Sequence, residues 1–289
     1  MDFKATFKKY YQLSKPGIIR ANVLTAAAGY LLAAKLHVDW VILLSLLAGF
    51  VLIIAGSCAY NNYLDRNIDK AMARTKKRGL VTGDISGRAA LTYATVTTLL
   101  GLALLAITQN TITLLLALTG IFGYVVLYGY TKRTTVHGTL VGCISGAISL
   151  VAGYTAVVGR IDSGAVLLFI LMTAWQMAHF YGIALYRQKD YAAAKIPVMP
   201  VVYGVDITKI QVVIYIVLFI IVAICLAVSG TVGIIATSII VLLGLLWLGR
   251  SILGYRSLAS DMWGKRVFLS SLFVMMGMTI SLAFGSYLG

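Results

Sequence analysis

A chain of 289 residues with 60% hydrophobic and 11% charged residues is too apolar to be a soluble domain. Its composition instead predicts a polytopic membrane protein. Its net charge of +15 would otherwise suggest a nucleic-acid partner, but the placement of the charges described below makes that partner unnecessary. Residues 1–15 are polar and basic and show no apolar core followed by a cleavage site, so we expect the first apolar segment to be a retained span.

Apolar windows of about 20 residues predict nine membrane-spanning helices. Two short joins, at 108–111 and 229–231, leave seven or eight spans open as alternatives. We therefore expect an all-α polytopic protein that forms one domain over residues 1–289, without a soluble appendage. The predicted spans, in chain order, are 18–36, 40–60, 89–107, 111–130, 139–158, 164–185, 210–228, 231–249 and 267–287.

The charged residues divide unevenly between the two sides of such a bundle. If the spans alternate in direction, 22 of the 24 Lys and Arg residues share one side, and only Lys35 and Arg160 lie on the other. Seven of the nine Asp residues lie on the same basic side, which therefore carries the whole net charge of +15. The positive-inside rule makes that side cytoplasmic. We expect a bacterial cytoplasmic (inner) membrane protein with a cytoplasmic N-terminus and, with nine spans, an external C-terminus.

The most specific motif follows the second span. Asn61, Asp65 and Asp69 are spaced i, i+4 and i+8, which places three oxygen-bearing side chains on one helix face, about 6 Å apart along the axis. Carboxylates near the membrane are costly and usually functional, although a solvated helix end among lipid headgroups is the alternative. Hard oxygen ligands beside guanidinium groups suit a Mg²⁺–diphosphate site, and hence an enzyme that acts on a lipid diphosphate. The basic residues that follow are Arg66, Arg74, Arg78 and Arg88.

Two further loops fall on the same predicted side. After the sixth span, Asp190 would complete a second metal site, and Arg187 and Lys189 would bind phosphate. The alternative for this segment is an ordinary cytoplasmic loop stiffened by two prolines. After the fourth span, Lys132 and Arg133 are either further diphosphate contacts or positive-inside anchors.

Histidines give a weaker signal. His179 lies within the sixth predicted span, and an ionisable side chain inside a membrane is a functional candidate by default. Three roles stay open for it, namely an axial ligand of haem, a proton carrier and a hydrogen-bonded interior group. His137, at the cytoplasmic start of the fifth span, is a second candidate.

The cysteines and most of the tyrosines are expected to be structural. Cys58, Cys143 and Cys225 lack Cys-x-x-Cys spacing, so we predict small buried side chains in membrane helices and neither a disulfide nor a zinc site. Tyrosines near cytoplasmic helix ends predict an interfacial belt, with a few of them lining a pocket where π-faces would stabilise an allylic cation. These tyrosines are Tyr60, Tyr63, Tyr124, Tyr128 and Tyr130.

The pattern Asn-x-x-x-Asp-x-x-x-Asp at 61–69, followed by Arg74-Thr75 and Arg78, resembles the UbiA superfamily of intramembrane prenyltransferases. The likeness runs from about residue 10 to at least 270 and is greatest to the branch that farnesylates haem B. Quinone-type relatives usually carry a second Asp-x-x-x-Asp after the sixth span, where this chain has only Asp190, with Tyr186 four residues before it. The segments that carry the likeness to the haem branch are Lys15–Ile19 with Asn22, Tyr130–Arg133, Trp175–Met177 with His179, Lys189–Tyr191 and Ile196–Val202.

This resemblance implies a nine-helix bundle around a cytoplasm-facing cavity, with farnesyl diphosphate and haem B as substrates and haem O as product. It implies a Mg²⁺ cofactor and metal ligation by Asn61, Asp65, Asp69 and Asp190. It also implies diphosphate binding by Arg66, Arg74, Arg78, Lys132, Arg133, Arg187 and Lys189. The residues expected on the acceptor side are Asn22, His137, His179 and Tyr186. Contact with a terminal oxidase or a haem A synthase is left open by the sequence.

The chain departs from the family pattern at several positions. Ser149-Leu150 stands where members commonly carry Pro-Pro, and Lys195 stands where they carry Gly or Asn. Two alternative functions stay open. One is a UbiA-type enzyme with a quinone precursor or a chlorin as acceptor, which residues 175–202 disfavour. The other is a transporter with a cation site. A transporter would not require arginines beside Asn61, Asp65 and Asp69, so the arginines of this segment disfavour it.

Overall fold

The computed structural model describes residues 3–35 and 37–285, and this part of the chain contains helices and no strands. Nine of its helices are long and apolar enough to cross a membrane, which confirms the all-α, nine-span prediction. The predicted ends of the first and last spans, at Leu36 and at 286–287, lie outside the described residues.

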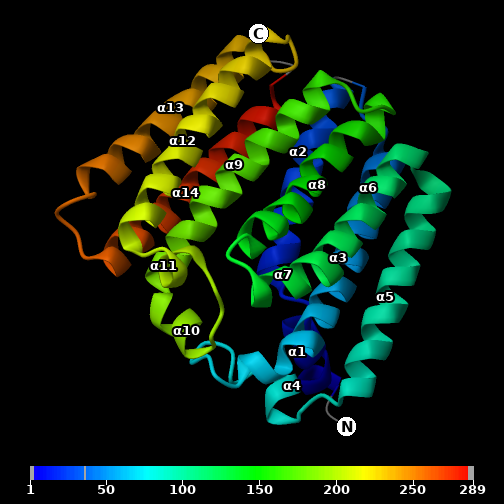
Figure 1. Ribbon diagram of the computed structural model, residues 1–289. Helices are drawn as coiled ribbons and strands as arrows, with labels where there is room; N and C mark the ends of the chain where they lie inside the picture. Colours follow the sequence, from blue (N-terminus) through cyan, green and yellow to red (C-terminus); the bar gives the residue numbers. More distant parts are fainter. Residues whose placement is uncertain (1–2, 36, 286–289) are drawn as a thin grey trace.

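The spanning helices begin and end as follows: α2 (Pro16–Ala34), α3 (Trp40–Asp69), α5 (Gly87–Thr108), α6 (Thr111–Phe122) continued by the π-helix η1 (Gly123–Leu127) and α7 (Tyr128–Thr134), α8 (Gly138–Val158), α9 (Ser163–Tyr186), α12 (Val205–Val228), α13 (Ile234–Leu253) and α14 (Ser260–Ala283). Four short helices gather at one end of the bundle, which we call the basic end (Figure 1). They are α1 (Phe3–Leu13), α4 (Gly79–Thr82), α10 (Gln188–Ala193) and α11 (Met199–Val202).

Several spanning helices extend further toward the basic end than the apolar windows predict. The clearest case is α3, whose 30 residues span about 45 Å, longer than the roughly 30 Å hydrocarbon core of a bilayer. At the opposite end Asp39 caps α3 by accepting hydrogen bonds from the backbone N–H groups of Val41 and Ile42. The additional turns therefore carry Asn61 to Asp69 beyond the apolar part of the helix.

Both Asp residues at the end opposite α1 serve as helix caps. The Asp39 carboxylate begins α3, and the Asp162 carboxylate accepts a hydrogen bond from the Ala165 backbone N–H at 2.9 Å and begins α9. Asn110 caps α6 in the same way through the Thr113 N–H. Negative charge at a helix N-terminus is favourable, so the acids at this end have a structural role and are absent from the cavity described below.

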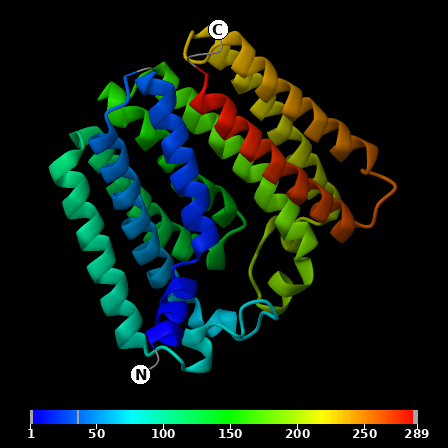
Figure 2. The same ribbon diagram turned by 180° about the vertical axis from the view of Figure 1, so that it is seen from behind.

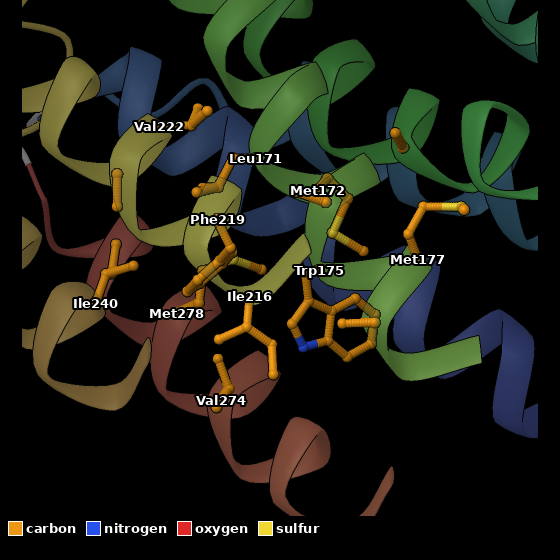
Figure 3. Close-up of a cluster of buried hydrophobic side chains, with 14 of the residues drawn as sticks. Leu171, Met172, Trp175, Met177, Ile216, Phe219, Val222, Ile240, Val274 and Met278 are labelled. Carbon is orange, nitrogen blue, oxygen red and sulfur yellow. The ribbon is translucent and has the colours of Figure 1, made fainter. Parts of the chain in front are cut away.

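The core lies where α9 packs against α8, α12 and α14, while α3 and α5 pack together at the far side of the bundle (Figures 1 and 2). Ile216 and Phe219 of α12 meet Val274 and Met278 of α14 there, with Trp175 of α9 alongside them (Figure 3). Burying side chains of this size contributes about 1.5–3 kcal/mol each in water, and within a bilayer packing contacts replace much of that term. All three cysteines are free; Cys58 and Cys143 are buried as predicted, whereas Cys225 is exposed, so the prediction is wrong there.

Helices α2 and α8 pack closely against one another at two glycines. A Cβ atom on Gly153 would meet the backbone carbonyl oxygen of Ala26, and one on Gly29 would meet that of Leu150. Small residues allow membrane helices to come this close. The contact fixes α2, and with it the residues of α2 that line the site.

Candidate active site

A polar cavity of about 430 Å³ opens at the basic end. One of its walls is formed by Asn61, Asp65 and Asp69 of α3, which we call the Asp row. Asn61, Asp65 and Asp69 all line the cavity and are buried, with exposed fractions of 2%, 9% and 4%. Their four-residue spacing places them on the face of α3 that is turned inward. The structure thus brings the three residues together on one wall.

Each of these three residues accepts a hydrogen bond from a cation in a different part of the chain. Asn61 Oδ1 accepts a hydrogen bond from Lys15 Nζ at 2.7 Å. Asp65 Oδ2 accepts one from Lys132 Nζ at 2.5 Å, and Asp69 Oδ2 accepts one from Arg78 Nη1 at 2.6 Å. The cavity wall therefore alternates acceptors and cations, an arrangement that suits a ligand carrying both a metal ion and anionic oxygens.

Lys15 is the residue of this cavity that sequence reasoning missed. It stands between α1 and α2 with φ at +51°, a left-handed conformation that is unfavourable for a side chain with a Cβ. Burial lowers the pKa of its ammonium group to about 8. In the sequence Lys15 looks like one more positively charged anchor before an apolar span. The local signs of its role are its place in the Lys15–Ile19 segment, which carries the family resemblance, and Pro16, which starts the helix directly after it.

We expect Lys15→Met to raise about tenfold the KM for the prenyl diphosphate that the family resemblance implies as substrate, because one charge-assisted contact is worth roughly 1.5–3 kcal/mol. Steady-state kinetics and binding of inorganic diphosphate would measure the change. The matched control is Lys9→Met, since Lys9 is exposed on α1 and forms an ion pair with Asp84 at 3.8 Å, away from the cavity. Equal KM values for the two variants would remove Lys15 from the site.

Asn22 and His179 line a second cavity, described below, and the other predicted residues separate into two groups. Arg74, Arg78, Lys132, Tyr186 and Arg187 line the polar cavity together with the Asp row. The residues that the structure does not bring onto its wall are Arg66, Arg133, His137, Lys189 and Asp190.

Three residues of this second group lie outside the cavity, where they contact other side chains or solvent. Arg66 stacks on the Tyr63 ring at 4.2 Å, and His137 is exposed. Arg133 Nη2 reaches Asp65 Oδ1 at 3.0 Å, although the side chain is more than a third exposed. Arg133 thus supports the row from outside the cavity.

The segment after α9 closes the cavity on one side with Tyr191 and residues 196–198. Within it, Lys195 has φ at +53°. This left-handed conformation favours glycine or asparagine, which explains in physical terms why those residues are common there in the family that the chain resembles. The departure at Lys195 leaves the turn itself intact.

A second, mostly apolar cavity of about 380 Å³ lies deeper in the bundle. Asn22 and His179 line it, and the Ser149 hydroxyl donates a hydrogen bond to Asn22 Oδ1 at 2.7 Å. The Ser149-Leu150 departure thus adds a polar contact to this wall. Five residues line both cavities, which therefore meet, and these are Ile18, Tyr124, Gly142, Phe180 and Phe268.

The π-helix η1 sets the position of two tyrosines at this junction. A π-turn contains an extra residue, and such turns are frequent at functional sites. It follows α6 and places Tyr124 on both cavity walls and Tyr128 on the polar one, with the two rings stacked 5.6 Å apart. Lys132, one turn further along, lies 4.9 Å from the centre of the Tyr128 ring. By contrast Tyr130 is 69% exposed, as an interfacial tyrosine would be.

The donor set on the polar wall fits Mg²⁺. Within 3–35 and 37–285 no group of three or more His, Cys, Asp or Glu side chains is placed to hold a metal. Mg²⁺ in phosphate-transfer sites, however, is commonly bound by one or two carboxylates together with substrate phosphates and water. Asp65 and Asp69 with the Asn61 amide oxygen supply that number of hard ligands in one buried row.

Residues 22–272 of the chain match the UbiA prenyltransferase family. A protoheme IX farnesyltransferase of Yersinia pseudotuberculosis is 40% identical over 277 residues, covering 96% of this chain and 94% of that protein. Protoheme IX farnesyltransferase 2 of Chromobacterium violaceum is 44% identical over 279 residues, covering 96% and 92%.

Solved structures share the fold at lower identity. A digeranylgeranylglyceryl phosphate synthase superposes with a TM-score of 0.80 at 18% identity, over 97% of this chain and 98% of that one. A UbiA homologue from Archaeoglobus fulgidus, bound to GPP and Mg²⁺, superposes with a TM-score of 0.71 at 16% identity, over 95% and 99%. At these identities the likeness establishes the architecture alone.

Proposed function

Since the chain belongs to the UbiA prenyltransferase family, we propose that it transfers a farnesyl group from farnesyl diphosphate to the 2-vinyl group of haem B, with addition of water, to give haem O. It is an integral membrane enzyme, and residues 3–35 and 37–285 contain nine helices long and apolar enough to span a membrane. The excess of Lys and Arg at the basic end supports a cytoplasmic location for that end, in a bacterial inner membrane.

One observation carries this proposal, namely that a cation- and carboxylate-lined cavity adjoins an apolar one and shares five lining residues with it. A prenyl diphosphate has the same two parts, a charged head and a hydrocarbon tail. Bound across the junction, it would place the bond to be broken beside Tyr124, Phe180 and Phe268, the aromatic residues common to both cavities. A transporter for a simple cation would need only the first of these cavities.

In the polar cavity Asn61, Asp65 and Asp69 would hold Mg²⁺, which when bound supplies neutralising charge to the diphosphate. Arg74 and Arg187 line the same cavity and would stabilise the negative charge that develops on the leaving group. The cations that contact the row, Lys15, Lys132 and Arg78, are within reach of the same oxygens.

At the junction the bond between farnesyl C1 and the diphosphate oxygen breaks, and its electron pair leaves with diphosphate. The allylic cation accepts an electron pair from the terminal vinyl carbon, which forms the new carbon–carbon bond. Water then adds to the neighbouring carbon and releases a proton, which leaves a hydroxyethylfarnesyl side chain. The π-faces of Tyr124 and Phe268 would stabilise the first cation, and the apolar walls would keep water from it until the bond has formed.

The depth of the apolar cavity supports a donor of this length. Phe50 lines this cavity and lies about three turns before Asn61 on α3, roughly 16 Å along the helix axis. An extended farnesyl chain of about eleven bonds, each advancing it by about 1.2 Å, is roughly 13 Å long. On the acceptor side, Asn22 and His179 face the porphyrin in this proposal. The product would pass to a terminal oxidase or a haem A synthase.

Turnover by the full-length protein in nanodiscs tests the proposal. We expect haem B, farnesyl diphosphate and Mg²⁺ to give a product heavier than haem by a farnesyl group plus water, detected by mass spectrometry and abolished by a chelator. Diphosphate release without that product would exclude haem as acceptor and leave a quinone precursor or a chlorin to be screened. Folded protein that gives neither signal would contradict the enzymatic assignment.

A further inference from the structure

His179 is held on α9 by aromatic rings and a single hydrogen bond. Its ring stacks on Trp175 at a centroid distance of 4.8 Å, while Phe180 and Phe268 lie at 5.1 Å and 5.2 Å. Its Nδ1 atom is 2.6 Å from the hydroxyl oxygen of Ser271 on α14. The side chain lines the apolar cavity near the junction, where Phe180 and Phe268 belong to both cavities.

The hydrogen bonds of Ser271 determine which histidine nitrogen carries the proton. The Ser271 hydroxyl donates to the backbone carbonyl of Phe268 at 2.6 Å. A hydroxyl has only one proton, so Ser271 accepts from His179, and Nδ1 is the protonated nitrogen. Trp175, whose indole appears in Figure 3, donates from Nε1 to the Ser271 backbone oxygen at 2.9 Å and holds the same turn of α14 against α9.

The second ring nitrogen, Nε2, consequently carries a lone pair. It has no hydrogen-bond partner in the part of the chain that the structure describes, and the ring borders the cavity. A doubly protonated ring would be a buried charge without a counter-ion among aromatic neighbours, so the neutral form is favoured. A neutral imidazole with one nitrogen fixed by a hydrogen bond and the other free is the usual arrangement of a metal-ligating histidine.

We propose that Ser271 is a positioning residue that fixes His179 in the Nδ1–H tautomer and thereby presents Nε2 to the iron of the haem acceptor. The inference rests on the proposed function, because it takes haem as the substrate. An iron–nitrogen bond would anchor the porphyrin on α9. A vinyl group would then face Phe180 and Phe268, where the allylic cation forms.

Haem titration of the full-length protein in nanodiscs tests this without relying on turnover. We expect ferric haem B to bind the wild type with the absorption and electron paramagnetic resonance spectra of a nitrogen-ligated iron, and His179→Ala to lose them. Ser271→Ala is expected to weaken haem binding about 10- to 100-fold and to shift the spectra, while Ser271→Thr, which keeps the hydroxyl, retains them. The matched control is Ser270→Ala, a buried neighbour on α14 that lines neither cavity.

Thermal unfolding and diphosphate release identify variants that have lost the fold rather than the ligand. Wild-type spectra in both His179→Ala and Ser271→Ala, with haem product still formed, would overturn the inference and leave the proposed function standing. Loss of ligation in His179→Ala with no change in Ser271→Ala would overturn the role of Ser271. A wild type that releases diphosphate but never modifies haem would overturn the acceptor assignment, and this inference with it.

Discussion

Replacing Asp65 with Asn is expected to reduce kcat/KM about 10³-fold, the largest effect on activity of any single substitution considered. Asp65 binds Lys132 through one carboxylate oxygen and Arg133 through the other, in the middle of the row on α3. Asn keeps the size and one acceptor but removes the charge that would hold a divalent cation against the diphosphate. Electrostatic groups aimed at a developing charge are commonly worth 10²–10³-fold each, and this one also orients two cations. Product formation and diphosphate release would both be measured.

The control for Asp65→Asn is Asp84→Asn, since Asp84 is half exposed and interacts with Lys9 and Thr82 outside the cavity. We expect its activity to stay within about twofold of wild type, because exposed pairs contribute little. Asp190→Asn is the informative companion, because Asp190 was predicted as a fourth ligand but does not line the cavity. Near-normal turnover in Asp65→Asn and Asp69→Asn, in protein shown to be folded, would refute the metal-site assignment.

The second prediction with a large expected effect concerns the stability of the fold. Gly153→Ala is expected to lower the free energy of unfolding by about 3 kcal/mol, because the added Cβ would collide with the Ala26 carbonyl oxygen where α8 crosses α2. The helices must separate, and α2 carries Asn22 into the apolar cavity, so activity is expected to fall as well. The midpoint of thermal unfolding in detergent, read by size-exclusion chromatography, would report the loss.

Gly249→Ala makes the same chemical change in α13, where nothing lies within 4 Å of the added atom. There the lower backbone entropy of alanine is expected to stabilise the helix by up to about 1 kcal/mol. The two variants should therefore shift the unfolding midpoint in opposite directions. A rise in both would show that α2 and α8 tolerate a wider separation than the glycine contact implies.

The features that could be predicted from the sequence are those that depend on one helix at a time. Nine apolar stretches give nine spans, and a four-residue spacing gives the row at Asn61, Asp65 and Asp69, because both depend on one helix at a time. Residues whose role depends on two elements meeting could not be found in this way. Lys15 reaches Asn61 only because α2 begins beside α3.

Ser271 shows the same limit, since it is one of several serines in an apolar helix until α14 is packed against α9. The opposite error also occurs, in which a basic residue has the charge needed to bind phosphate but does not face the cavity. Lys189 follows Arg187 closely in sequence and looks equally suited to bind phosphate. Arg187 lines the cavity, whereas Lys189 is exposed.

The π-helix between α6 and α7 restricts the number of residues that this membrane span can have. Removing one residue from 123–127 would restore an ordinary α-turn and leave the apolar character of the span almost unchanged. Everything after the deletion would then rotate by about 100° relative to α6, which would turn Lys132 away from Asp65. What this stretch must keep constant is its number of residues, a requirement that no hydropathy profile expresses.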